Sequence, residues 1–195
     1  MEDRQKLSIQ KFYDCLIEHD VSYFCGVPDS VVGPFSKFVA ANHNQRHIIA
    51  ANEGNAIGLA IGYHVATSKL ALIYMQNSGL GNAIDPLVSL ADESVLSVPM
   101  LLLVGWRGQP GTGDEPQHAK QGAITTELLE IMGIPYLILS RSPEEMKLQV
   151  KQATQQAIKS NMPFALIVQR ATFDEYKSTA ISAAKYPLTD RKSVV

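Results

Sequence analysis

The chain has 195 residues, of which 46% are hydrophobic and 18% are charged, and its formal net charge is −2 at pH 7. This composition is typical of a globular protein and excludes a disordered chain. A negative net charge without a run of Lys or Arg argues against a nucleic-acid-binding protein held by a basic face.

Targeting and cross-linking signals are scarce along the chain. The first 14 residues are polar and lack the apolar core of a signal peptide. No run approaches the roughly 20 apolar residues that cross a bilayer. Two cysteines, Cys15 and Cys25, exclude a disulfide framework and a Cys-rich zinc site, and we expect both to be buried free thiols. We therefore predict no membrane partner, no nucleic-acid partner and a cytoplasmic location.

Short apolar runs alternate with helical patterns along the chain. The predicted strands are residues 21–25, 47–50, 70–75, 99–106, 135–139 and 164–169. The predicted helices are residues 7–19, 52–66, 82–90, 125–132 and 143–159, with another beginning after residue 30. This alternation is typical of an α/β fold with a doubly wound, mostly parallel six-stranded sheet and helices on both faces. We predict one domain over residues 1–173 and a tail or linker remnant over 174–195.

Ligands of such sheets bind beyond the carboxyl ends of the strands, so the loops that follow strands are informative. The first, Gly-Val-Pro-Asp-Ser at residues 26–30, offers Asp29 and Ser30 either as helix caps or as site residues. The second leads to Glu53, which begins a helix with no other charge from Gly54 to Val65. Glu53 either favours the helix dipole or is a desolvated carboxylate suited to proton transfer.

Two further loops follow the third and fourth predicted strands. Residues 76–82 supply side-chain amides, a hydroxyl and two glycines at a helix start, as a phosphate-binding turn does. They match neither a Rossmann fingerprint nor a P-loop. Residues 107–122 form a long predicted loop, either solvated or functional. Its Arg107, His118 and Lys120 are groups that bind anions or move protons.

Five segments of the chain match the motifs of a known family in order and spacing. They are Gly-Val-Pro-Asp-Ser (26–30), Asn-Glu-Gly-Asn-Ala-Ile-Gly-Leu-Ala-Ile-Gly-Tyr-His (52–64), Tyr-Met-Gln-Asn-Ser-Gly-Leu-Gly-Asn (74–82), Gly-Trp-Arg-Gly (105–108) and Asp-Glu-Pro-Gln-His (114–118). With them, residues 7–173 resemble the phosphonopyruvate decarboxylases, which are thiamine diphosphate-dependent 2-oxo-acid decarboxylases. The chain is also similar to the α subunit of sulfopyruvate decarboxylase, which shares the run Gln-Asn-Ser-Gly-Leu-Gly-Asn.

The resemblance implies a pyrimidine-binding domain alone. Such enzymes bind thiamine diphosphate between this domain and the pyrophosphate-binding domain of another chain. A Gly-Asp-Gly motif followed by Asn-Asn ligates Mg²⁺ at the diphosphate in that second domain, and this sequence lacks it. We therefore expect no metal ligand in this chain. We expect a homo-oligomer, at least a dimer that pairs across glycine-faced helices such as residues 54–62, or a complex with a separate pyrophosphate-binding chain.

The resemblance also implies roles for the catalytic candidates. Glu53 matches the family's glutamate that hydrogen-bonds N1′ of the aminopyrimidine. Asp29 and His118 fall where related enzymes place acids and histidines near the substrate, and they are candidates for protonating the reaction intermediate.

Binding roles are expected for a second set of residues. The resemblance places Asn77, Ser78 and Gly79 near the pyrimidine ring of the cofactor. Ser30 is expected at the substrate. We expect Arg107 and Lys120 to hold a phosphonate or carboxylate, because a dianionic substrate needs cationic partners.

The predicted function is thiamine diphosphate-dependent decarboxylation of 3-phosphonopyruvate to phosphonoacetaldehyde, with the second half of the site supplied from elsewhere. Two alternatives remain. The chain is a non-catalytic or truncated domain that acts as an interaction module, or it is the α subunit of a sulfopyruvate decarboxylase.

Overall fold

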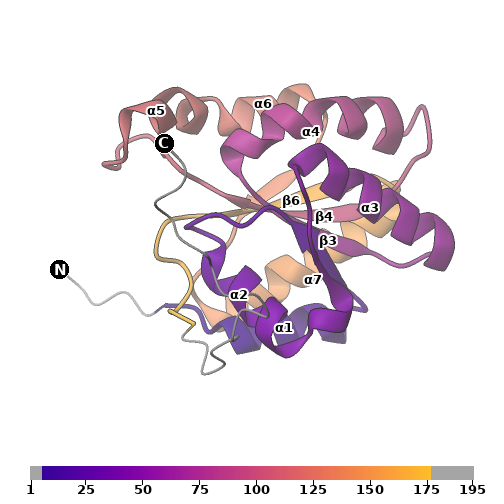
Figure 1. Ribbon diagram of the computed structural model, residues 1–195, viewed down its shortest axis with the longest axis horizontal. Helices are drawn as coiled ribbons and strands as arrows, with labels where there is room; N and C mark the ends of the chain where they lie inside the picture. Colours follow the sequence, from indigo (N-terminus) through magenta and orange to yellow (C-terminus); the bar gives the residue numbers. More distant parts are fainter. Residues whose placement is uncertain (1–5, 177–195) are drawn as a thin grey trace, which may run out of the picture.

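A computed structural model describes residues 6–176 of the chain. Six parallel strands form one sheet in the order β2-β1-β3-β4-β6-β5 (Figure 1). The strands are β1 (Tyr23–Gly26), β2 (His47–Ile49), β3 (Ala71–Gln76), β4 (Met100–Gly105), β5 (Tyr136–Ile138) and β6 (Pro163–Val168). The predicted fold class is thus confirmed, and every pairing in the sheet is parallel.

Seven α-helices connect the strands within residues 6–176. They are α1 (Ile9–Glu18), α2 (Gly33–Asn42), α3 (Glu53–Thr67), α4 (Leu80–Pro86), α5 (Pro116–Ala123), α6 (Thr125–Ile131) and α7 (Pro143–Ser160). Short turns η1 (Asn44–Arg46) and η2 (Asn77–Gly79) precede β2 and α4, and a π-helical segment, η3 (Leu87–Ala91), extends α4. None of these helices is both long and apolar enough to cross a membrane.

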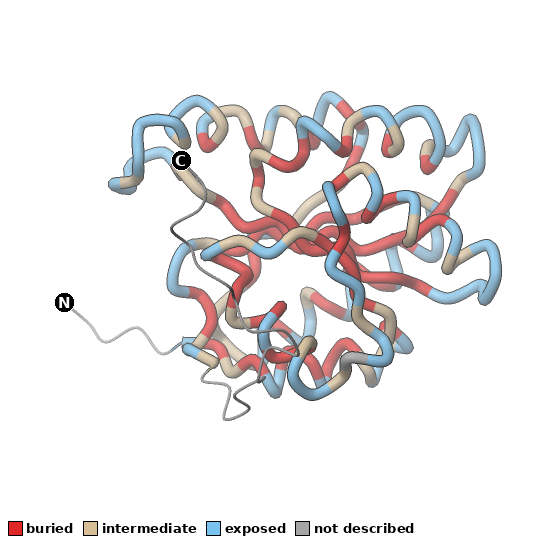
Figure 2. The backbone as a smooth tube through the Cα atoms, viewed as in Figure 1, coloured by how far each residue is buried: buried red, intermediate tan, exposed pale blue. Residues whose placement is uncertain are grey.

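Helices cover both faces of the sheet, as Figure 1 shows for α1, α2 and α7 on one side and α3, α4 and α6 on the other. The sheet separates two hydrophobic cores, the first beneath α1, α2 and α7 and the second beneath α3, α4 and α6. Because side chains alternate along a strand, Leu72 and Tyr74 of β3 pack in the first core, and Ile73 and Met75 pack in the second. Residues of β4 are buried throughout, as expected for a central parallel strand. The buried residues accordingly concentrate in the sheet and the inner helix faces (Figure 2).

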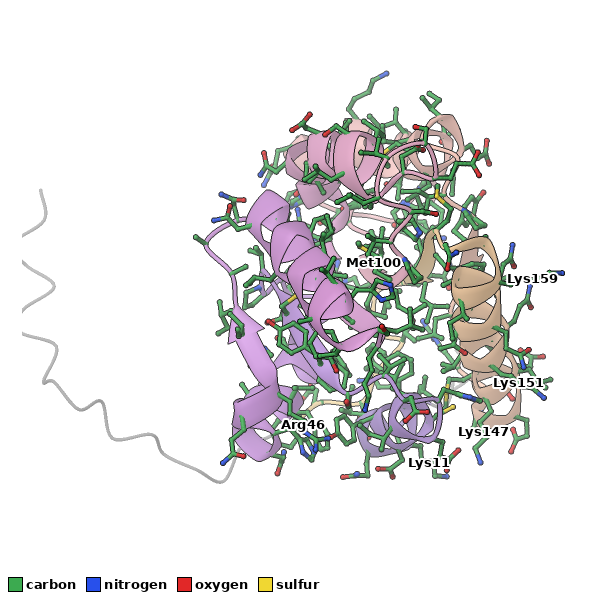
Figure 3. The ribbon with its side chains drawn as sticks, turned by 90° about the vertical axis from the view of Figure 1, so that its right-hand side faces the viewer. Lys11, Arg46, Met100, Lys147, Lys151 and Lys159 are labelled. Carbon is green, nitrogen blue, oxygen red and sulfur yellow. The ribbon has the colours of Figure 1, made fainter. Side chains whose placement is uncertain are left out.

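Helix α7 shows how sequence determines one of these elements. The Oγ of Ser142 accepts a hydrogen bond from the Glu145 backbone N–H at 3.4 Å, and Pro143 occupies the first turn, so the predicted cap is present. Met146 and Val150 are buried against the sheet. The lysines of α7 lie on its outer face and point away from the rest of the molecule (Figure 3).

The structure bears on the predicted long loop and on the predicted C-terminal tail. Residues 107–122 are not one long loop, because α5 begins at Pro116, whose fixed φ suits a first helical turn. The predicted tail starts at Asp174, yet Asp174 Oδ1 accepts from the Ile9 backbone N–H at 3.0 Å and the Tyr176 hydroxyl accepts from Asn42 Nδ2 at 2.9 Å. Residues 177–195 lie outside the described part, and the boundary at 173 stays a prediction.

Leu103, in the middle of β4, is fully buried in the first core. We expect Leu103→Ala to lower the free energy of unfolding by about 2–5 kcal/mol, because it removes buried methyl groups and leaves a cavity. Urea unfolding measures this. The matched control is Ile131→Ala, at a side chain that is 83% exposed, for which we expect a change within about 0.5 kcal/mol. Equal effects of the two variants would contradict the burial assigned to β4.

Candidate functional site

The strand order puts a topological switch point at the carboxyl ends of β1 and β3. The chain runs from β1 to β2 on one side and then crosses to β3 on the other side of β1. Loops that leave neighbouring strands in opposite directions open a crevice, which is the usual ligand site of such sheets. Asp29 follows β1 and Asn77 follows β3, so both predicted site residues lie at this edge.

Glu53 is the first residue of α3 and is only 9% exposed. Its Oε2 accepts a hydrogen bond from Asn82 Nδ2 at 2.9 Å. Its Oε1 rests over Gly79, where a Cβ would lie 2.6 Å from that oxygen. Gly79 therefore leaves the space that the carboxylate occupies. Within residues 6–176 no donor reaches Oε1, so one oxygen of this buried carboxylate can accept from a ligand.

Asp29 is both a cap and a candidate site residue. Its Oδ1 accepts from the backbone N–H groups of Val31 at 3.0 Å and Val32 at 2.7 Å, which begins the turn into α2. Its Oδ2 is buried and has no hydrogen-bond partner in the described part of the chain. A Cβ on Gly105 would lie 3.0 Å from Oδ2, so a glycine at the end of β4 again makes room for a carboxyl group.

Burial raises the pKa of the Asp29 carboxyl above its usual value. The N–H groups of Val32 and Val31 and the positive charges of Arg107 and His118 act in the opposite direction without cancelling this effect. Two conclusions follow. Asp29 holds a proton more readily than a surface aspartate, and Arg107 and His118 lie close enough to influence it.

Arg107 is held by two side chains from different loops. Its Nε donates to Asp114 Oδ2 at 2.8 Å, and Nη2 donates to Asp114 Oδ1. Its Nη1 donates to Ser30 Oγ at 3.0 Å. The structure thus brings the predicted pair Ser30 and Arg107 together, and it adds Asp114, for which the sequence suggested no role.

Asn77 is 1% exposed and joins the end of β3 to the end of β4. Its Nδ2 donates to the carbonyl of Arg107 and to Thr125 Oγ1, both at 2.9 Å, while its Oδ1 accepts from the Arg107 backbone N–H at 3.2 Å. Ser78 Oγ accepts from Gln76 Nε2 at 2.6 Å. The predicted cofactor contacts of Asn77 and Ser78 stay predictions, and in the structure the amide of Asn77 holds the main chain of Arg107.

Lys120 takes no part in the contacts that hold Arg107 among the described residues. It lies on α5 two residues beyond His118, and two residues correspond to about 200° around a helix. The side chains of His118 and Lys120 therefore project from opposite sides of α5. The side chain of Lys120 is exposed, and no hydrogen bond or ion pair from the described residues reaches it. The expected role of Lys120 in holding a phosphonate or carboxylate stays a prediction.

Three residues of this arrangement were missed. Asn82 holds Glu53, Asp114 holds Arg107, and Gly105 gives space to Asp29. Asn82 and Asp114 belong to the motifs quoted above, and both motifs follow strands that end at the same edge of the sheet. Which partner each one meets depends on contacts between loops, and spacing alone does not reveal them.

Residue types that can ligate metals do not cluster in the described part of the chain. Residues 6–176 contain no group of three or more His, Cys, Asp or Glu side chains that could hold a metal ion. Both cysteines are buried and unpaired, as predicted.

A family model described as "Thiamine pyrophosphate enzyme, N-terminal TPP binding domain" matches residues 9–130. A phosphonopyruvate decarboxylase of Streptomyces hygroscopicus is 28% identical over 148 residues, which are 76% of this chain and 36% of that protein. The sulfopyruvate decarboxylase subunit alpha of Methanocaldococcus jannaschii is 30% identical over 164 residues, which are 84% of this chain and 94% of that protein. The chain thus spans about a third of the first relative and nearly all of the second.

Solved structures share the fold. Benzoylformate decarboxylase from Polynucleobacter necessarius superposes with a TM-score of 0.62 and 16% identity, over 93% of this chain and 33% of that one. A 2-oxoglutarate:ferredoxin oxidoreductase from Magnetococcus marinus superposes with a TM-score of 0.63 and 17% identity, over 84% of this chain and 29% of that one. At these identities the likeness concerns the fold alone.

The space over Gly79 can be tested directly. Gly79→Ala places a Cβ 2.5 Å from Glu53 Cγ, so we expect the carboxylate to be displaced and the melting temperature to fall. Gly81→Ala is the matched control, because a Cβ there meets nothing within 4 Å and alanine favours the helix. We expect this control to melt at or above the wild-type temperature. If both variants melt alike, the contact with Glu53 is not tight.

The raised pKa of Asp29 predicts a pH dependence. Between the ordinary value of 3.8 and the raised one, the folded state binds more protons than the unfolded state. The free energy of unfolding contributed by Asp29 therefore falls as pH rises through this interval. Asp29→Asn keeps Oδ1 as a cap and should remove this fall, measured by urea unfolding from pH 4 to 8. Asp20→Asn, at an exposed site, should keep the wild-type profile, and an unchanged profile for Asp29→Asn would refute the assignment.

Proposed function

This chain belongs to the thiamine pyrophosphate enzymes through their N-terminal TPP-binding domain, and we propose that it binds the aminopyrimidine of thiamine diphosphate in the decarboxylation of a 2-oxo acid. The proposal rests on the burial of Glu53 and on the hydrogen bonding of its two carboxylate oxygens. This carboxylate is buried, one oxygen is fixed by Asn82, and the other faces the space left by Gly79 without a donor from residues 6–176.

The residues present fit the cofactor. An aminopyrimidine needs an acceptor or acid at a ring nitrogen, and the free oxygen of Glu53 is suited to that contact. When bound, thiamine diphosphate supplies the nucleophilic carbon and the electron sink for loss of carbon dioxide. Glu53 then holds or gives a proton at N1′. Asn82 keeps its carboxylate in one orientation, so less freedom is lost when the ligand binds.

Asp29 and His118 serve as proton donors or acceptors on the substrate side. Asp29 has a buried oxygen without a partner in the described part and a raised pKa, which suit a group that exchanges protons at a reacting centre. His118 lies near enough to stabilise the ionised form of Asp29. Arg107, oriented beside Ser30, binds the acidic group of the substrate.

We propose 3-phosphonopyruvate as the substrate and phosphonoacetaldehyde as the product. Relatives named phosphonopyruvate decarboxylase and sulfopyruvate decarboxylase subunit alpha support a 2-oxo acid with a second acidic group. Sulfopyruvate is the second candidate, favoured by the greater share of the sulfopyruvate relative that the chain covers. Arg107 suits either oxyanion.

The second half of the site comes from a pyrophosphate-binding domain outside these 195 residues, which would also ligate Mg²⁺. Relatives named as subunits support a partner chain. A Cβ at Gly58 or Gly62 of α3 would meet nothing within 4 Å, so this part of the helix is open for another chain to approach. Assembly as at least a homodimer and a cytoplasmic location stay predictions.

Glu53→Gln tests the function. We expect the complex with a pyrophosphate-binding chain, thiamine diphosphate and Mg²⁺ to lose at least about 100-fold in turnover of 3-phosphonopyruvate, since proton transfer typically contributes 10²–10⁴. Carbon dioxide release is the assay, with sulfopyruvate in parallel to distinguish the substrates. Glu93→Gln, at an exposed position, is the control and should keep wild-type turnover.

Calorimetric titration of the complex with thiamine diphosphate and Mg²⁺ separates the alternatives. Binding by the wild-type complex supports a cofactor domain, whereas a non-catalytic interaction module would bind neither cofactor nor substrate. Wild-type turnover by Glu53→Gln would contradict the role of Glu53.

A further inference from the structure

Arg107 is fixed more completely than a substrate-binding side chain requires. Asn77 holds its backbone N–H and carbonyl, Asp114 holds two of its guanidinium nitrogens, and Ser30 holds the third. An arginine loses considerable side-chain entropy when it is ordered. Here that cost is met within the protein before any ligand binds.

The hydrogen-bond inventory of the guanidinium shows what remains for a ligand. The group carries five N–H donors in a planar fork. Three are used, one each by the two oxygens of Asp114 and one by Ser30 Oγ. Two donors are left, both on the terminal nitrogens. Because the fork is rigid, Asp114 and Ser30 together determine the direction in which these two point.

Asp114 is itself saturated. Its Oδ2 also accepts from the Gly108 backbone N–H, and its Oδ1 from the Glu115 backbone N–H, both at 2.8 Å. The bonds from Arg107 and these N–H groups hold the pKa of Asp114 far below its usual range, so it stays ionised. The carboxylate therefore accepts four hydrogen bonds and has no capacity left for a substrate group.

The same segment holds the helix that carries His118. Gly108 has φ +65°, and a Cβ there would overlap the carbonyl of His118. The indole Nε1 of Trp106 donates to the carbonyl of Gly122 at 2.8 Å. The segment of residues 106–114 therefore lies directly against α5, and a change in its conformation would move His118 as well as Arg107.

We propose that Asp114 is a positioning residue, which presents two N–H donors of Arg107 to the distal phosphonate or sulfonate of the substrate. The proposal rests on the proposed function, in which Arg107 binds that group. Asp114 touches no substrate. It acts by fixing the guanidinium plane, so the acid group meets a prepared pair of donors.

Loss of the Asp114 carboxylate has two opposite effects on anion binding, one through its charge and one through its hold on the Arg107 guanidinium. Asp114→Asn removes a negative charge beside Arg107, which by itself would strengthen anion binding. It also replaces one acceptor oxygen by an NH₂ donor, which cannot accept from Arg107, so the fork loses its bidentate partner. If position dominates, as we propose, anion binding weakens although the site becomes more positive.

The experiment uses the full chain in complex with its pyrophosphate-binding partner, thiamine diphosphate and Mg²⁺. Phosphonoacetate and sulfoacetate serve as probes, since they carry the distal acid without a 2-oxo group. Calorimetry gives their dissociation constants, and steady-state kinetics gives KM and kcat. Glu115→Gln is the matched control, because it removes the same charge next to Arg107 from a side chain that accepts no hydrogen bond among the described residues.

We expect Asp114→Asn to weaken binding of both probes at least about tenfold and to raise KM similarly, with kcat changed less than about threefold. Glu115→Gln should bind the probes as well as wild type or better. In an Arg107→Lys background the effect of Asp114→Asn should nearly vanish, because the two residues act as one unit.

Unchanged or tighter probe binding by Asp114→Asn overturns the proposal, as does an equal loss in the Arg107→Lys background. A fall in melting temperature with unaltered probe affinity also overturns it and leaves Asp114 a structural residue. Failure of the proposed function is distinguishable, because the wild-type complex would then bind no thiamine diphosphate and release no carbon dioxide from either 2-oxo acid.

Discussion

The contact between Asn77 and the main chain of Arg107 connects the loop that follows β3 with the loop that follows β4. Asn77 follows β3 and Arg107 follows β4, and these strands pair in parallel up to Gln76 and Gly105. Beyond that point the pairing of β3 with β4 supplies no further ladder bonds, yet the buried polar groups of the chain still need partners. The amide of Asn77 satisfies the N–H and the carbonyl of Arg107 together. The ends of two central strands therefore stay in register where the loops of the candidate site begin.

Space at the strand ends is the second constraint. Glu53 and Asp29 come from different loops, and each rests against a glycine of another segment, Gly79 and Gly105 respectively. A Cβ at Gly79 would lie 2.6 Å from Glu53 Oε1, and one at Gly105 would lie 3.0 Å from Asp29 Oδ2, so a larger residue at either glycine would displace the carboxyl group. The close approach buries both groups and leaves one oxygen of each without a partner in the described structure. Such oxygens cost free energy in the free protein, and a ligand donor can recover it.

Much of the fold could be predicted because it depends on local pattern. Strands such as β4 are continuous apolar runs, and α7 has its cap and proline in the chain itself. Helix α5 could not be recognised in the sequence because it is short and polar and follows a glycine-rich loop. In the structure, Gly108 packs against its first turn. That packing is a contact between segments, so neither periodicity nor propensity reports it.

The same distinction holds for the site. Motif and loop position were enough to place Glu53, Asp29, Ser30 and Arg107 at one edge of the sheet, because parallel strands bring all their carboxyl ends there. Their roles at that edge stay predictions. The direction in which each side chain points was not predictable from the sequence. The position of Lys120 on the side of α5 opposite His118 follows from a helical turn that the sequence pattern did not indicate. Asp114 as the partner of Arg107 depends on a turn between residues 108 and 114 that returns the carboxylate to the guanidinium.

These contacts also decide what kind of recognition the chain can offer. The charge of Arg107 is largely balanced by Asp114, and Lys120 takes no part in the contacts around it, so the described residues that hold Arg107 present oriented donors more than net positive charge. A sulfonate carries one negative charge and needs little beyond those donors. A doubly ionised phosphonate needs a further cation, since burying unbalanced charge is costly. If phosphonate is the natural group, a cation other than Arg107 has to balance its second charge, and we expect substrate preference to depend on the complete site rather than on this pair of residues alone.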